Sequence, residues 1–266
     1  PHGLRKANPE GKFKLENSVP ATCFPPAVTS ACSWNPELLY EMGVALGEEC
    51  LQERVSVILG PGVNMKRSPL CGRNFEYFSE DPYLAGEMGA AYIRSLQAQG
   101  ISACVKHFAA NNQETRRMRG SSQVDERTLH EIYLPAFEAA VKQGGARSVM
   151  CAYNAINDVF CAENKMLLQE VLRERWGFDG FVVTDWGAVK DRVKGIDAGL
   201  DLEMPGGGGT QDQKIVQAVK DGTLDEALLD NAVRNMLRFV SDYQRYRNPD
   251  ATIDRAENSI LSGRLA

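Results

Sequence analysis

Long hydrophobic runs and an excess of basic residues are both missing from this 266-residue sequence. It contains no stretch of about 18 apolar residues, the shortest that reads as a membrane-spanning helix. Its 35 acidic residues outnumber its 30 basic ones, and the formal net charge of -5 argues against a nucleic acid partner. We therefore expect no membrane and no nucleic acid partner, and a small molecule as the ligand.

Metal-binding and disulfide patterns are missing as well. The seven cysteines form no CxxC pair, and residues 130–134 (HEIYL) begin like a zinc-binding helix but carry leucine where the second histidine would stand. We therefore expect no metal and no other cofactor, and interpret His130 as a surface or capping residue. Cys104 and Cys151 lie in apolar runs, where free thiols behave as small hydrophobic residues. This pattern slightly favours a reducing, cytoplasmic compartment.

The pattern that is present alternates short apolar runs with helical periodicity. We expect helices over 35–53, 83–97, 126–142 and 165–175, and strands over 27–32, 55–59, 103–107, 148–151, 181–185 and 200–204. Strands joined by helical connections predict a parallel sheet, because parallel neighbours need a long crossover. Both a doubly wound sheet and a barrel fit this alternation.

Polar residues at the ends of the predicted strands favour the barrel. Lys106, His107, Tyr153, Asp185 and Glu203 all fall at or just beyond the carboxyl ends of different strands. Such convergence is typical of the active face of a (β/α)8 barrel. Six strand candidates are two short of eight, so we predict a partial (β/α)8 TIM-type barrel whose first strand precedes residue 1.

The end of the predicted domain is marked by a helix signal. Residues 223–226 (TLDE) have the spacing of a capping box, and an amphipathic pattern continues to residue 240. We therefore expect one barrel domain over residues 1–240, and a polar tail or linker over 241–266.

Asp185 and Trp186 follow an otherwise apolar strand. A carboxylate there can cap a helix or pair with a cation. An aromatic face beside a carboxylate is, however, how the C–H faces of a sugar are stacked while its anomeric carbon is attacked. The pair therefore suggests a glycosidase site.

Two further groups carry polar chemistry. Lys106 and His107 can both donate to sugar hydroxyls, although an isolated histidine is more often a core residue and a barrel lysine can form a Schiff base. In the loop over residues 71–82, Arg73 braced by Glu76 can present a fixed fork to vicinal hydroxyls.

Six motifs, in this order, resemble those of the N-terminal barrel of glycoside hydrolase family 3, on its β-glucosidase branch. They are PHGLR at 1–5, GPGVN at 60–64, GRNFE at 72–76, KHF at 106–108, MCAYN at 150–154 and TDW at 184–186. The resemblance covers about residues 1–240. It implies a retaining, exo-acting β-glucosidase that hydrolyses terminal β-D-glucosyl residues of a β-glucoside or oligosaccharide.

The resemblance also assigns roles to residues. It implies that Asp185 is the nucleophile that forms the glycosyl-enzyme intermediate and that Trp186 lines the sugar subsite. The positions where the family has its glycone-binding residues are Arg5, Arg73, Lys106, His107, Arg117 and Tyr153. The adjacent Arg116 is an alternative to Arg117. Cations and hydrogen-bond donors around a carboxylate keep it ionised, as a retaining nucleophile requires.

The second carboxyl group of the mechanism departs from the family pattern. On the β-glucosidase branch the acid/base Glu usually comes from a following α/β sandwich domain, which these residues do not contain. The N-acetylglucosaminidase branch instead carries an Asp-x-His element after its Lys-His, and residues 111–117 (NNQETRR) lack it. The family also usually has an Asp two residues before its Pro-His-Gly motif. We therefore expect a separate sandwich domain as the source of the acid.

Three acids of the chain could approach Asp185, but each has another role available. Glu203 can brace a cation of the barrel, Glu76 can orient Arg73, and Glu114 can pair with one of the arginines that follow it. Two other functions stay open: a Schiff-base lyase that uses its barrel lysine, and a non-catalytic sugar-binding barrel or split-enzyme subunit that needs an acid/base from another domain.

Overall fold

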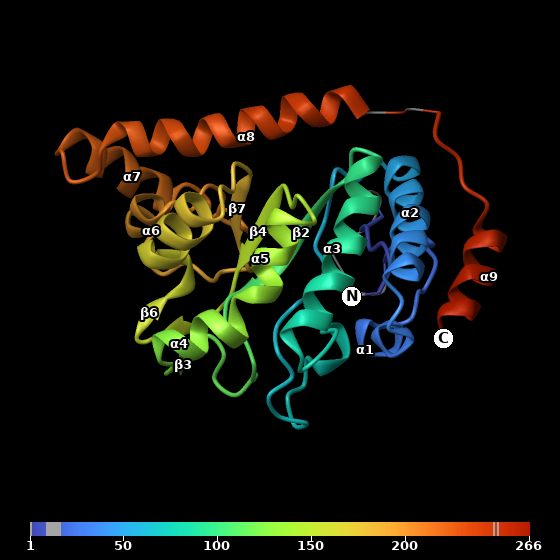
Figure 1. Ribbon diagram of the computed structural model, residues 1–266. Helices are drawn as coiled ribbons and strands as arrows, with labels where there is room; N and C mark the ends of the chain where they lie inside the picture. Colours follow the sequence, from blue (N-terminus) through green and yellow to red (C-terminus); the bar gives the residue numbers. More distant parts are fainter. Residues whose placement is uncertain (1, 9–16, 247, 249) are drawn as a thin grey trace.

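The computed structural model of the chain describes residues 2–8, 17–246, 248 and 250–266 (Figure 1). The helices, including the short 3-10 and π segments labelled η, are α1 (Ala27–Ser30), η1 (Ala31–Ser33), α2 (Pro36–Gln52), η2 (Asn74–Glu76), α3 (Pro82–Ala98), α4 (Glu126–Thr128), η3 (Leu129–Tyr133), α5 (Pro135–Lys142), η4 (Cys161–Glu163), η5 (Met166–Arg175), α6 (Arg192–Ala198), α7 (Thr210–Lys220), α8 (Glu226–Tyr246) and α9 (Arg255–Leu265). The strands are β1 (Val57–Ile58), β2 (Ser102–Phe108), β3 (Ser121–Ser122), β4 (Ser148–Cys151), β5 (Ala155–Ile156), β6 (Val159–Phe160) and β7 (Phe181–Thr184).

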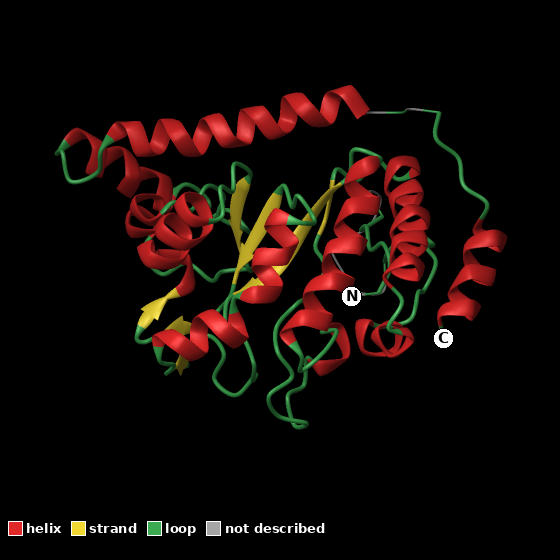
Figure 2. Cartoon of the chain, in the orientation of Figure 1, coloured by secondary structure: helices red, strands yellow, loops and turns green. Residues whose placement is uncertain are grey.

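The main sheet has four parallel strands in the order β1-β2-β4-β7 (Figure 2). Every neighbour in this order follows a helical crossover, as predicted. At the β7 edge a parallel bridge joins Val183 to Leu202. Within the described part of the chain the sheet does not close on itself, so the fold is a partial (β/α)8-type barrel. A small second sheet, β3-β5-β6, lies beside it.

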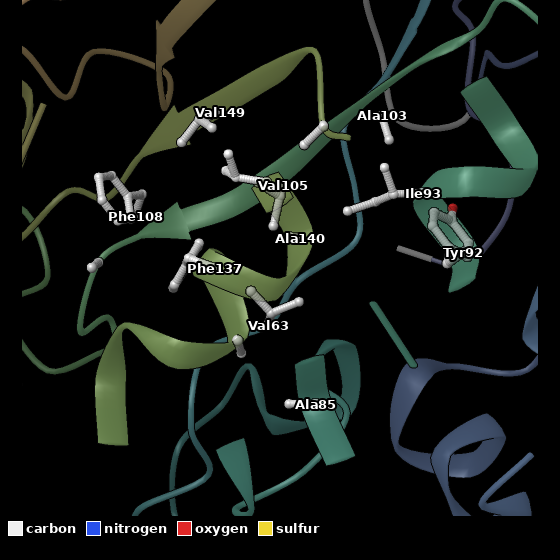
Figure 3. Packing of buried hydrophobic residues seen from close by; sticks show 14 of the residues in the cluster. Val63, Ala85, Tyr92, Ile93, Ala103, Val105, Phe108, Phe137, Ala140 and Val149 are labelled. Atoms are coloured by element: carbon white, nitrogen blue, oxygen red, sulfur yellow. The ribbon is translucent and has the colours of Figure 1, made fainter. Parts of the chain in front are cut away.

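One face of the main sheet is covered by helices. Val105 and Val149 are fully buried in the main core cluster together with Phe137 and Ala140 of α5 (Figure 3). The ring of Phe108 packs edge-on against Phe137, with centroids 5.1 Å apart. Parallel sheets bury both faces, and every residue of β2, β4 and β7 is buried.

The opposite face of the sheet carries a second cluster. Cys104 of β2, Met150 of β4 and Val183 of β7 alternate with the residues of the first face and pack on this side. Helix α8 contributes Phe239, whose ring lies 4.8 Å from that of Phe181. This helix therefore covers part of the face that a closed barrel turns inward.

The helices predicted over 35–53 and 83–97 are confirmed as α2 and α3, and their caps explain where they start. Asn35 Oδ1 accepts hydrogen bonds from the first turn of α2, and Pro36 follows it. In α3, Asp81 Oδ1 accepts a hydrogen bond from the Leu84 N–H, and Pro82 is the first residue of the helix. These side chains satisfy backbone N–H groups that a helix start leaves unpaired.

Two predicted strands are wrong. Residues 27–32 form α1 and η1, because the run is rich in small residues and begins directly after Pro26, which takes the N-cap position. Residues 200–204 form only the single bridge at Leu202. The carboxylate of Asp201 accepts a hydrogen bond from the Val182 N–H at 2.6 Å. This N–H therefore cannot form a further hydrogen bond between strands, and the pairing stays a single bridge.

Two helix predictions need smaller corrections. The helix expected over 126–142 is divided into α4, η3 and α5 at Pro135, which has no N–H to donate. The expected capping box at 223–226 does not form, because Asp225 Oδ1 accepts the hydrogen bond of the Ala227 N–H. Residues 241–266 contain the end of α8 and helix α9, whose Asn258 donates to the buried Glu49 of α2 at 3.0 Å.

Candidate active site

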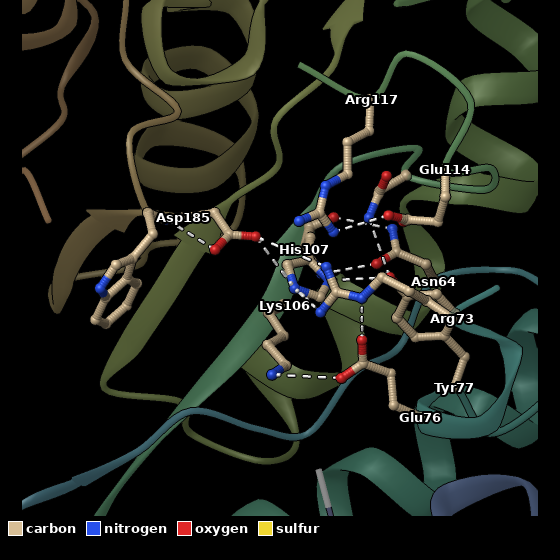
Figure 4. Close-up of polar contacts among 11 residues, drawn as sticks. Asn64, Arg73, Glu76, Tyr77, Lys106, His107, Glu114, Arg117 and Asp185 are labelled. Atoms are coloured by element: carbon tan, nitrogen blue, oxygen red, sulfur yellow. Dashed lines mark hydrogen bonds and ion pairs between the residues drawn. The ribbon is translucent and has the colours of Figure 1, made fainter. Parts of the chain in front are cut away.

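The carboxyl ends of β2, β4 and β7 bring together a cluster of charged side chains (Figure 4). Asp185 follows β7 directly and is 9% exposed. Its backbone N–H donates to Cys151 O at 3.2 Å, which continues the pairing with β4, and its Oδ1 accepts from the Trp186 N–H at 2.8 Å. Among the described residues no hydrogen-bond partner reaches its other oxygen, Oδ2.

Lys106 and His107 are adjacent on β2, where regular alternation would send them to opposite faces. The register with β4 shifts between Val105 and Phe108: three steps on β2 match two on β4. Such an extra residue re-aims side chains, and here both reach the same cluster. Asn64 fixes the backbone of His107 from both sides, since its Oδ1 accepts from His107 N at 2.7 Å and its Nδ2 donates to His107 O at 2.9 Å.

Glu76 holds two cations next to Asp185. Its carboxylate accepts a hydrogen bond from Arg73 Nε and lies 3.5 Å from Lys106 Nζ, with only 3% of its side chain exposed. Burial acts to raise the pKa of Glu76, but the charges of Lys106 and Arg73 outweigh it and lower this pKa. Burial lowers the pKa of Lys106, and the carboxylate of Glu76 opposes that shift. Arg73 Nη1 lies 3.8 Å from Asp185 Oδ2.

His107 is fully enclosed between these groups. Its Nε2 lies 2.9 Å from Arg73 Nη2 and 3.5 Å from Asp185 Oδ2. Burial, followed by the positive charges of Lys106 and Arg73, holds the pKa of His107 well below its usual range. The imidazole is therefore neutral, and its approach to Asp185 is not an ion pair.

Arg117 and Tyr153 line another part of the site. The guanidinium of Arg117 lies over the Tyr153 ring, 4.6 Å from its centroid, and donates to Glu114 Oε2 at 2.8 Å. Burial, reinforced by the negative charge of Asp185, raises the pKa of Tyr153 to about 12. Of the two adjacent arginines Arg117 is thus the one in the network, and Arg116 is exposed.

Two predicted site residues are less enclosed. Trp186 is 40% exposed and follows Asp185 at the rim of the sheet. Arg5 is exposed in the N-terminal segment. Pro1, the first residue of the predicted motif at 1–5, lies outside the described residues.

The three acids that could have served as a second carboxyl group are engaged as expected. Glu76 braces Arg73 and Lys106, and Glu114 pairs with an arginine three residues later. Glu203 lies 4.0 Å from Arg192 Nε of α6. Each carboxylate is therefore already facing a cation.

The part of the chain that the structure describes contains no group of three or more His, Cys, Asp or Glu side chains arranged to hold a metal ion. None of its helices is both long enough and apolar enough to cross a membrane.

The sequence pattern of the glycosyl hydrolase family 3 N-terminal domain matches residues 10–239. The chain belongs to glycosyl hydrolase family 3. It is 55% identical over 267 residues to thermostable beta-glucosidase B of Acetivibrio thermocellus, covering 100% of this chain and 35% of that protein. It is 53% identical over 243 residues to an exo-alpha-(1->6)-L-arabinopyranosidase of Bifidobacterium longum, covering 91% of this chain and 32% of that protein.

Solved family 3 structures have the same fold. The beta-glucosidase 3B of Thermotoga neapolitana in complex with glucose superimposes with a TM-score of 0.92 at 44% identity, covering 99% of this chain and 38% of that one. The chain thus spans about a third of the length of the relatives it matches. The expected family and barrel architecture are confirmed.

Sequence reasoning missed three polar residues of this family 3 site. Asn64, Tyr77 and Asn111 are all buried and all contact His107 or its partners. Asn64 ends the GPGVN motif, and Asn111 lies four residues beyond His107. For Asn64 the available signal was a polar residue at the end of a glycine-rich, otherwise apolar stretch.

Proposed function

We propose that this chain is the nucleophile-bearing barrel of a retaining, exo-acting β-glucosidase, with Asp185 as the nucleophile. The observation that carries the proposal is the state of the Asp185 carboxylate. One oxygen is fixed by a backbone N–H, and the other is buried with no hydrogen-bond partner among the described residues. A carboxylate oriented through one oxygen, with the lone pairs of the other uncommitted, is suited to attack an anomeric carbon.

The surrounding groups support this role for Asp185. Arg73 places positive charge near its free oxygen, which favours the ionised form that attacks. Lys106 has three N–H donors and one identified anionic partner, so it can also donate to sugar hydroxyls. Arg117 and Tyr153 present further donors, and the exposed ring of Trp186 offers a face for the sugar.

The acid/base that protonates the leaving group is proposed to lie outside these 266 residues, on an α/β sandwich domain. Two observations support this assignment. Glu76, Glu114 and Glu203 each already face a cation, whereas a general acid must carry the proton that it gives to the leaving group. The relatives are about three times longer than this chain. The family match ends at residue 239, which supports a domain boundary near residue 240.

A second substrate is favoured by one of the relatives. The 53% identical protein named an arabinopyranosidase shows that this part of the family is not confined to one glycone. An α-L-arabinopyranoside lacks the hydroxymethyl group of a β-D-glucoside and differs in the orientation of its 4-hydroxyl. Comparing kcat/KM for the two aryl glycosides therefore decides the glycone.

The proposed function is tested by following the hydrolysis of an aryl β-D-glucoside with NMR. The β-anomer of glucose should appear first, and Asp185→Ala should lose about 10^4 or more in turnover, with azide restoring activity and giving the inverted product. An Asp185→Ala variant that keeps a tenth of the activity would refute the nucleophile. Borohydride trapping of a carbonyl substrate on Lys106 would support a lyase instead.

A further inference from the structure

We propose that Tyr77 is a positioning residue that holds His107 in the tautomer protonated at Nδ1, so that no N–H of His107 points at Asp185. The proposal rests on the proposed role of Asp185 for its catalytic meaning, while the tautomer itself follows from the contacts of the imidazole ring (Figure 4). Among the described residues, the hydrogen bonds of the Tyr77 hydroxyl are to His107 and Asn111, and none is to Asp185.

The Nε2 side of the ring is decided by Arg73. Arg73 Nη2 lies 2.9 Å from His107 Nε2, within hydrogen-bond distance. A guanidinium has five N–H donors and no acceptor, so the hydrogen bond requires a lone pair on Nε2. A proton on that nitrogen would face the proton of the arginine.

The Nδ1 side of the ring is decided by Tyr77. The Tyr77 hydroxyl oxygen lies 3.0 Å from His107 Nδ1 and also accepts from Asn111 Nδ2 at 3.1 Å. A hydroxyl oxygen can accept two hydrogen bonds, and Nδ1–H is the second donor. Tyr77 is fully buried and its ring stands nearly perpendicular to the imidazole, at 81°, so the oxygen is held in place.

The choice of tautomer matters because the ring carries only one proton. Burial and the nearby cations keep the pKa of His107 well below its usual range. Burial likewise raises the pKa of Tyr77, so its hydroxyl stays a neutral acceptor. The single imidazole proton must therefore lie on one nitrogen or the other, and the partners select Nδ1.

The other tautomer would place an N–H at Nε2, 3.5 Å from Asp185 Oδ2. That proton would compete for the oxygen proposed to attack, and it would displace the guanidinium of Arg73 from the ring. With the proton on Nδ1, which faces Tyr77, the lone pairs of Asp185 Oδ2 stay unoccupied and Arg73 stays hydrogen-bonded to Nε2. Tyr77 therefore acts on the nucleophile through His107.

The test is the protonation state of each ring nitrogen, measured by multiple-bond 1H–15N correlation on protein labelled at histidine. The chain has three histidines, and His107→Gln assigns the signal of interest. We expect Nδ1 protonated and Nε2 unprotonated in the wild type. Tyr77→Phe should move the proton wholly or partly to Nε2 and lower kcat about 10- to 100-fold, by analogy with the loss of a partner that orients a metal-ligating histidine.

Tyr92→Phe is the matched control, because Tyr92 is a buried tyrosine of α3 that lies in the main core cluster. It should leave the His107 tautomer and kcat unchanged. A wild-type spectrum with the proton on Nε2 would overturn the proposal even if Tyr77→Phe folded poorly, and so would a folded Tyr77→Phe with an unchanged tautomer. The spectrum needs no substrate, so a protein with the expected tautomer that releases no dinitrophenolate from a dinitrophenyl glucoside would contradict the proposed function instead.

Discussion

Glu76→Gln should destabilise the protein and narrow its active pH range. The side chain is 3% exposed and neutralises two cations, since it accepts a hydrogen bond from Arg73 and lies 3.5 Å from Lys106. Glutamine keeps the size of the side chain but removes the charge, which leaves the buried Lys106 and the partly buried Arg73 without their shared anion. Removing one partner of a buried ion pair typically costs about 3–5 kcal/mol. For a domain of this size that corresponds to a fall in Tm of about 6–20 °C.

The pH effects have definite signs. The folded-state pKa of Glu76 is lowered, so the stability it contributes is present above the ordinary value of 4.5 and is lost as pH falls through the folded-state value. In Glu76→Gln, this loss of stability at acidic pH should be absent. Lys106 already has a lowered pKa, and without Glu76 it should lose its proton at a still lower pH. The alkaline limb of the pH–rate profile should therefore move to lower pH.

Denaturant unfolding across pH and the pH dependence of kcat/KM on an aryl glucoside measure both effects. Glu138→Gln is the matched control: Glu138 pairs with Lys142 at 2.6 Å, but its side chain is 42% exposed, so the change should cost less than about 1 kcal/mol. If Glu76→Gln were as stable as Glu138→Gln and kept the wild-type alkaline limb, Glu76 would not be the group that balances these cations.

Three further predictions follow from other parts of the structure. Trp186→Ala should raise KM for an aryl glucoside about 2- to 10-fold with little change in Tm, because the ring is 40% exposed and contributes stacking; an unchanged KM would remove it from the sugar subsite. Asp201→Ala should lower the unfolding free energy by about 3–5 kcal/mol in denaturant, since it leaves Arg173, 2.7 Å from the carboxylate, without its buried partner. The 266-residue chain alone should hydrolyse cellobiose negligibly and a dinitrophenyl glucoside relatively better; cellobiose turnover of about 1 per second would place an acid within it.

The sequence predicted the crossover pattern well because each element carried its own local signal. Strands β4 and β7 are continuous β-branched or apolar runs, and helices α2 and α3 begin at an Asn-Pro and an Asp-Pro pair. A strand prediction failed where a side-chain hydrogen bond, and not the local residue pattern, determines the backbone pairing. The run at 200–204 looks like a strand, but Asp201 takes a backbone N–H that the ladder would need.

The candidate site was predictable as a set of strand-end residues but not as a geometry. The parallel topology alone implies that Lys106 and Asp185 share one edge of the sheet. His107 points to the same side because the register of β2 shifts between Val105 and Phe108. No residue pattern in the sequence predicts this shift. Tyr77 and Asn111 were missed because their role depends on a contact between two loops far apart in sequence from Asp185.

Mechanism-based labelling tests the central assignment most directly. A 2-deoxy-2-fluoro-β-D-glucoside with a good leaving group slows hydrolysis of a glycosyl-enzyme intermediate, so the sugar stays on the nucleophile and can be located by peptide mass spectrometry. We predict a single label on Asp185, and no label in Asp185→Asn. A label on Glu76, Glu114 or Glu203, or a fully active protein that is never labelled, would contradict it.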